Sequence, residues 1–180
     1  SDIYKDTPQI IIDKFIKNCE KLNMNYIIYS GSKQVNQPQL FYQTLSKFKK
    51  TIVYLDIYSK IKKYPELFNT KNMDFMTLNL DQTNITGPVC SDIRILKLLN
   101  DNLYLFSYNP VVLQFLQIWF EHNKPIEYRQ HKFLEYAFNI SLSINKLRCF
   151  WFPKEYIIGP IITFDDSRIF DFFNNIYSNT

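Results

Sequence analysis

The sequence predicts a single compact α/β domain in which helices flank a central mixed, mostly parallel sheet. Short apolar runs typical of strands alternate along the chain with segments that repeat apolar residues at helical spacing. One run, Thr51–Asp56, is almost continuously apolar, which is typical of a strand covered on both faces of a sheet. No repeat, linker or low-complexity segment divides the 180 residues, so we expect one domain over residues 1–180.

The composition is that of a folded chain. Hydrophobic residues make up 46% of the sequence and charged residues 21%, which excludes a disordered chain. Three glycines and a single alanine, Ala137, argue against glycine-loop architectures and coiled coils. The net charge of +4 is a mild excess. The densest lysine cluster of the sequence lies within residues 47–63 and is more typical of solvated helix and turn ends than of a nucleic-acid-binding patch.

Three elements are predicted before residue 51. A threonine–proline pair begins a helix over residues 7–23, in which apolar residues recur at helical spacing. Residues 26–29 are apolar or aromatic and predict a short strand that stops at the following Ser-Gly-Ser. A second proline begins a helix over residues 37–50, which ends on basic residues suited to the negative end of the helix dipole.

The clearest strand covers Thr51–Asp56 and belongs, by its continuous apolar character, in the middle of a helix-flanked sheet. It ends on Asp56, and ligands of such sheets bind beyond the carboxyl ends of the strands. After it we expect a turn or short helix over residues 64–68, a strand over residues 74–79 and an irregular loop over residues 81–100.

The remaining elements continue the alternation of strands and helices. A strand over residues 103–107 precedes an amphipathic helix that begins at Asn109-Pro110. Beyond it, the predicted elements are a helix over residues 128–141, a strand over residues 147–152, a strand over residues 156–164 and a terminal helix over residues 167–177. Trp119 and Trp151 are expected to be core residues rather than platforms for a sugar.

General catalytic and metal-binding motifs are absent from the sequence. It contains no phosphate-binding loop, dinucleotide fingerprint, zinc-protease motif, nucleophile elbow or cysteine–histidine metal spacing. Three isolated cysteines, Cys19, Cys90 and Cys149, are typical of buried thiols in a reducing compartment. Neither a signal-peptide pattern nor an apolar run of membrane-spanning length is found, so we expect a cytoplasmic protein with no membrane partner.

Five short stretches of the chain follow one another in a distinctive order. The apolar strand that ends at Asp56 is followed within a few residues by the turn Pro65-Glu-Leu-Phe68. The other stretches are the helix start Gln37-Pro38, the strand and helix from Tyr104 to Trp119, the segment Gln130–Leu134 and the stretch Cys149–Tyr156. Together they resemble, over roughly residues 37–164, the GT-A family of nucleotide-diphospho-sugar transferases.

The resemblance implies a truncated GT-A-like fold without the first strand, and the transfer of a sugar from a nucleotide-sugar donor, with UDP-sugar favoured, to an acceptor. In that family an Asp-x-Asp sequence holds Mn²⁺ or Mg²⁺ against the donor diphosphate. Here this sequence reads Asp56-Ile57-Tyr58, so Asp56 is the implied metal and donor ligand. Tyr58 replaces the second carboxylate, and its ring is a candidate for stacking on a sugar or base.

The other implied site residues also depart from the family pattern. A family histidine after the last core strand is replaced by Asp165 and Asp166, each of which is either a metal ligand or a cap of the following helix. The acceptor-side acid is replaced by Glu127 or His131 as catalytic candidates. For Glu127 the alternative is a charge that stabilises a helix N-terminus.

Two other functions stay open at this point. The departures favour, as an alternative, an inactive GT-A-like fold that serves as a binding or scaffold module for a protein partner or forms a homo-oligomer. A nucleic-acid binder is the weaker hypothesis. It would use the lysines of residues 47–63 with Tyr54, Tyr58 and Tyr64 as stacking platforms.

Overall fold

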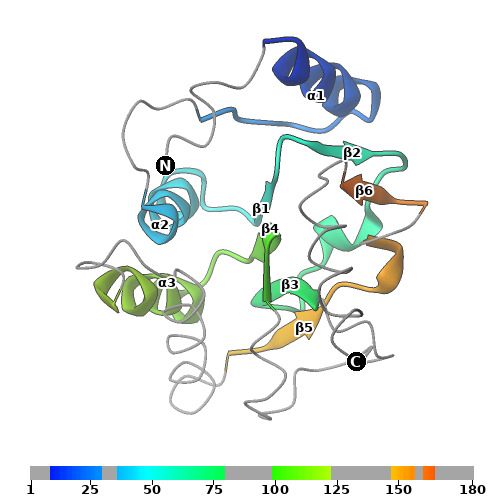
Figure 1. The fold of residues 1–180 in the computed structure, drawn as a ribbon. Coiled ribbons are helices and arrows are strands. Elements are labelled where there is room, and N and C mark those ends of the chain that lie inside the picture. The colour runs from blue at the N-terminus through cyan, green and yellow to red at the C-terminus, as the bar shows by residue number, and fades with distance from the viewer. Residues whose placement is uncertain (1–8, 30–35, 80–98, 123–146, 157–159, 165–180) are drawn as a thin grey trace, which may run out of the picture.

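A four-stranded mixed sheet in the order β1-β4-β3-β5 forms the centre of the structure, with helices and short elements on both of its faces (Figure 1). The strands β1, β3 and β5 run in one direction, and β4, which lies between β1 and β3, runs in the opposite direction. Their bounds are β1 Ile52–Leu55, β3 Phe75–Asn79, β4 Leu99–Phe106 and β5 Cys149–Trp151. This computed structural model describes residues 9–29, 36–79, 99–122, 147–156 and 160–164.

Two helices cover one face of the central sheet (Figure 1). They are α2 Gln37–Phe48 and α3 Pro110–His122. Because side chains alternate along a strand, Tyr54 of β1 and Tyr104 of β4 both face these helices. Phe41 of α2 packs among them, with ring centroids 5.0 Å from Phe106 and 6.0 Å from Trp119. Much of the aromatic excess therefore builds this half of the core, and Trp119 is a core residue as predicted.

The opposite face is covered by α1, a second two-stranded sheet and two short 3-10 helices. Their bounds are α1 Gln9–Lys21, β2 Ser59–Ile61, β6 Ile162–Phe164, η1 Glu66–Asn69 and η3 Lys154–Tyr156. Leu103 and Leu105 of β4 belong to this half of the core, together with Ile61 and Ile162 of the second sheet. Both faces of the central sheet are therefore covered, and the predicted α/β class is confirmed.

Most elements predicted from periodicity are present. The helices predicted over residues 7–23 and 37–50 correspond to α1 and α2. α2 ends where Lys49 adopts a left-handed conformation, with φ of 52°, and donates its N–H to the Leu45 carbonyl at 2.8 Å. The sheet is mixed as predicted. Among the described strands, however, β4 is antiparallel to both of its neighbours, so a mostly parallel arrangement is not confirmed.

Two expectations about elements are wrong, and one strand was not predicted. Residues 26–29 form no strand, and their phenols bind helices instead: Tyr26 donates to Glu20 at 3.3 Å, and Tyr29 shares a hydrogen bond of 2.9 Å with Thr44. Among the described strands β1 lies at an edge of the central sheet rather than in its middle. The strand β2 was not predicted, because its three residues include an exposed lysine and carry no periodic signal.

Other predictions are partly met or lie beyond the described residues. β4 begins at Leu99, inside the predicted loop. Of the strand predicted over residues 156–164, Tyr156 instead closes η3, the end forms β6, and residues 157–159 lie outside the described residues. The helices predicted over residues 128–141 and 167–177 lie outside the described residues. In the part of the chain that the structure describes, no helix is both long and apolar enough to cross a membrane.

Candidate functional site

The carboxyl ends of three strands lie at one edge of the central sheet. β1, β3 and β5 share a direction, so their carboxyl ends meet there, and the amino half of β4 reaches the same edge, where Leu103 pairs with Leu55. Asp56 follows β1 at this edge. Ligands of open α/β sheets bind beyond such ends. We call this side of the sheet the carboxyl edge.

Asp56 organises the turn that leads from β1 into β2. Its Oδ1 accepts a hydrogen bond from the backbone N–H of Tyr58 at 2.8 Å, which fixes the orientation of the carboxylate. Its carbonyl oxygen accepts the backbone N–H of Ser59 at 3.0 Å and also the Ser59 hydroxyl. Asp56 and Tyr58 are both half-buried, and Ile57 between them is buried in the core. The sequence Asp56-Ile57-Tyr58 is thus a rigid turn at the carboxyl edge.

The last described strand returns to the same turn. β6 pairs with β2 in antiparallel register, so Phe164 lies opposite Ser59 and Ile162 lies opposite Ile61. Asp165 is the next residue in the sequence after Phe164. The end of β6 and the Asp56 turn are therefore neighbours, although they are far apart in the sequence.

The predicted site residues divide into two groups. Asp56 and Tyr58 lie together at the carboxyl edge, whereas Glu127, His131, Asp165 and Asp166 lie outside the described residues. Within the described ranges, no group of three or more histidine, cysteine, aspartate or glutamate side chains is placed to hold a metal ion. The neutral phenol of Tyr58 is a poor ligand for a hard cation. The described residues therefore do not complete a site for Mn²⁺ or Mg²⁺.

A hydrogen-bond network that was not predicted lies at the opposite edge of the sheet. The buried Asp74, just before β3, receives Nε and Nη2 of Arg148 at 3.1 and 2.8 Å and the Arg148 backbone N–H at 2.9 Å. The Asn109 amide donates to Asp74 at 2.8 Å, and Asn109 Oδ1 caps α3 by accepting the Val112 N–H at 2.9 Å. Asp74 thus joins the start of β3 to the start of β5 and to the first turn of α3.

The surroundings of Asp74 keep it ionised. Burial opposes its charge, but hydrogen bonds from Arg148, the charge of Arg148 and the hydrogen bond from Asn109 together hold the pKa of Asp74 below its ordinary value. The hydrogen bond to Asp74 and its charge raise the pKa of Arg148 in turn. One sequence signal was present: Asp74 and Arg148 each stand at the start of a predicted strand. Local patterning could not show that these two strands are neighbours.

The residues suggested for nucleic-acid stacking are not gathered on one surface. The Tyr54 ring packs in the core, with its centroid 5.2 Å from that of Phe41 and 6.0 Å from that of Tyr104. The Tyr64 hydroxyl donates to Asn69 at 3.1 Å. Of the three proposed stacking residues, Tyr54 therefore belongs to the core.

Comparison with known proteins adds no family assignment. No known protein family matches this chain, and no curated protein matches it.

Proposed function

We propose that this chain binds the diphosphate of a nucleotide-sugar donor, with UDP-sugar favoured, at the carboxyl edge, and transfers the sugar to an acceptor as a GT-A-like glycosyltransferase. The observation that carries this proposal is the pairing of β2 with β6. It brings the chain just before Asp165 and Asp166 beside the turn of Asp56, so carboxylates far apart in the sequence become candidates for one site.

In this proposal each residue has a separate role. The Tyr58 N–H orients the Asp56 carboxylate, and Asp165 or Asp166 supplies the second carboxylate of the donor site. A bound Mn²⁺ or Mg²⁺ would supply charge neutralisation for the diphosphate leaving group. Tyr58 offers a ring that can stack on the sugar or base of the donor. Glu127 or His131 would act on the acceptor side.

Calorimetric titration of UDP and of UDP-sugars, with and without Mn²⁺, tests this proposal. We expect binding that requires the metal and that weakens about tenfold or more in Asp56→Asn. Asparagine still accepts the Tyr58 N–H, so this variant removes the charge and keeps the turn. Asp13→Asn, on the exposed side of α1, is the matched control and should bind as the wild type does. Absence of binding to every donor, with and without Mn²⁺, would refute the proposal.

A second candidate function is that of a binding module that has lost the chemistry. The observation that favours it is a group of exposed apolar side chains, Tyr26, Ile27 and Tyr29, on the irregular segment between α1 and α2. Exposed apolar groups of this kind often mark protein–protein contacts. Sedimentation equilibrium tests it. A dimer that dissociates on Ile27→Ser, in a protein that binds no nucleotide, would favour this function, whereas a monomer that binds UDP with Mn²⁺ would exclude it.

A further inference from the structure

The outward side of α1 carries a row of lysines. Lys14, Lys17 and Lys21 are spaced by three and four residues, so they share one side of the helix, and all three are exposed. Ile10 lies one turn before Lys14 on this side and is 61% exposed, although it is a large apolar residue. The opposite side of α1 holds Cys19, which is buried, and Phe15, which packs on the core. The lysine row therefore points away from the protein.

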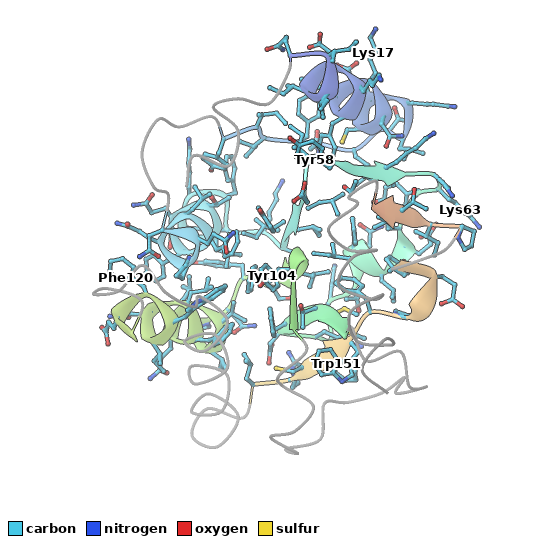
Figure 2. All side chains as sticks on the ribbon, viewed as in Figure 1. Lys17, Tyr58, Lys63, Tyr104, Phe120 and Trp151 are labelled. Carbon is cyan, nitrogen blue, oxygen red and sulfur yellow. The ribbon has the colours of Figure 1, made fainter. Side chains whose placement is uncertain are left out.

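The strand β2, which packs against α1, brings further lysines close to this row. The Asn18 side chain holds α1 against β2 through two hydrogen bonds to Ile61, from Nδ2 to the carbonyl oxygen at 2.7 Å and from the backbone N–H to Oδ1 at 2.8 Å. Lys60, Lys62 and Lys63 are exposed on β2 and just after it. Figure 2 shows Lys17 at the outer side of α1 and Lys63 beyond the end of β2. We call the set Lys14, Lys17, Lys21, Lys60, Lys62 and Lys63 the lysine face.

Two acidic residues of α1 border the lysine face. Asp13 precedes Lys17 by four residues and Glu20 follows it by three, so both carboxylates lie beside Lys17 on the exposed side of the helix. Asp13 accepts a hydrogen bond from the Gln9 amide at 2.9 Å, and Glu20 accepts the Tyr26 hydroxyl at 3.3 Å. Six lysines against these two carboxylates leave the lysine face with a net positive charge.

We propose that the lysine face docks the protein on an anionic lipid surface. A layer of anionic headgroups complements the positive charge, and each lysine close to it strengthens binding about fivefold. α1 lies at the outside of the molecule, where a flat surface can reach its whole length (Figure 1). Ile10 is placed to enter the boundary between headgroups and acyl chains.

A lipid surface fits these residues better than a nucleic acid does. Single-stranded nucleic acid is held by basic residues combined with aromatic platforms. The exposed aromatic residues of the segment after α1, Tyr26 and Tyr29, are held by hydrogen bonds of their hydroxyls to Glu20 and Thr44 and are not interleaved with the lysines. An exposed isoleucine in line with the lysines has no role against phosphates but a direct one in a membrane interface. This inference departs from the sequence-based expectation of no membrane partner, because the sequence does not show that α1 packs against β2.

Vesicle co-sedimentation tests the proposal. The full chain is mixed with vesicles of phosphatidylcholine alone or with about one third phosphatidylserine, at low and at physiological salt. We expect binding to the phosphatidylserine vesicles only, with loss on raising the salt. The triple variant Lys14→Gln, Lys17→Gln, Lys21→Gln should weaken binding on the order of 100-fold. Ile10→Ser should weaken it several-fold without changing the net charge.

A matched control separates a docking surface from general charge. The triple variant Lys47→Gln, Lys50→Gln, Lys71→Gln removes the same charge from exposed positions outside the lysine face and should bind nearly as the wild type does. Circular dichroism checks that both triple variants are folded. Equal weakening by the two triple variants, or no binding to phosphatidylserine vesicles, would overturn the proposal. So would binding of a single-stranded oligonucleotide, but not of vesicles, that is lost in the α1 variant.

Discussion

Replacement of Asp74 by alanine should lower the free energy of unfolding by about 3 kcal/mol. Asp74 is 4% exposed and its carboxylate accepts hydrogen bonds from Arg148 and from Asn109. In Asp74→Ala the Arg148 backbone N–H and the Asn109 amide lose their partner, each at about 1–1.5 kcal/mol. The Arg148 side chain is 56% exposed, so in Asp74→Ala its guanidinium binds water instead. It therefore adds less to the loss of stability than a fully buried cation would.

Urea-induced unfolding at neutral pH measures this loss. Arg148→Gln should cost less, about 2 kcal/mol, because the Arg148 backbone N–H and the Asn109 amide still serve Asp74. The double variant should cost less than the sum of the two single variants, since they remove the same contacts. Asp13→Ala, an exposed aspartate on α1, should stay within about 0.5 kcal/mol of the wild type. A value for Asp74→Ala as small as this control, or smaller than that for Arg148→Gln, would refute the reasoning.

The same ion pair predicts a pH dependence. The pKa of Asp74 is lower in the folded protein than its ordinary value of 3.8, so its stabilisation is complete above the unfolded pKa. As the pH falls from about 4 through the still lower folded pKa, protonation removes the stabilisation. The stability difference between the wild type and Asp74→Asn should therefore be constant from about pH 5 to pH 7 and shrink below about pH 4. A difference that grows on acidification would contradict the assignment.

Three further predictions concern single side chains. Asn18→Ala should lower the free energy of unfolding in urea by about 1–2 kcal/mol, because the backbone N–H and carbonyl of Ile61 both lose their hydrogen bond to the Asn18 amide. A decrease below about 0.3 kcal/mol would show that water replaces these hydrogen bonds. Burial raises the pKa of the Cys19 thiol to about 11 and also raises the pKa of the Cys149 thiol. Both buried thiols should therefore react with a disulfide reagent at pH 8 only when the protein unfolds. Rapid labelling of either cysteine in the native protein, located by mass spectrometry, would contradict this burial. Trp119→Phe should cost under about 1.5 kcal/mol, against about 3–5 kcal/mol for Phe115→Ala. The reason is that the buried Trp119 Nε1 has no hydrogen-bond partner among the described residues, so its removal offsets the lost ring contacts. Thermal unfolding that ranks the two variants the other way would count against this prediction.

The local pattern of apolar residues was sufficient to predict the helices and strands that bury one or both of their sides in the core. α1 and α2 repeat apolar residues at helical spacing, and β3 and β5 are short apolar runs. The local sequence of each element therefore predicts which of its side chains are buried. The strand β2 could not be found in this way. Its three residues are held by β6 and by Asn18, both distant in the sequence, rather than by any pattern of their own. Residues 26–29 have a strand-like pattern, but their tyrosines bind side chains of α1 and α2.

The candidate site was predictable only where it depends on one strand. A carboxylate that ends an apolar strand marks a sheet edge, and Asp56 does lie at the carboxyl edge. That β6 ends beside Asp56 depends on the pairing of Phe164 with Ser59, which no local signal encodes. The Asp74–Arg148 pair was missed for the same reason, since its partners come from two strands that become neighbours only in the sheet.

The most direct test of the proposed donor site is an amide chemical-shift titration of the isotopically labelled protein with UDP and Mg²⁺, a diamagnetic cation. The two edges of the sheet give internal controls, because Tyr58 and Ser59 lie at the carboxyl edge while Ser107 and Arg148 lie at the opposite one. We predict saturable shifts at Tyr58, Ser59 and Phe164 that are lost in Asp56→Asn, with Ser107 and Arg148 unchanged. Shifts confined to the Ser107–Arg148 edge, or no saturable shift at all, would contradict a donor site at Asp56.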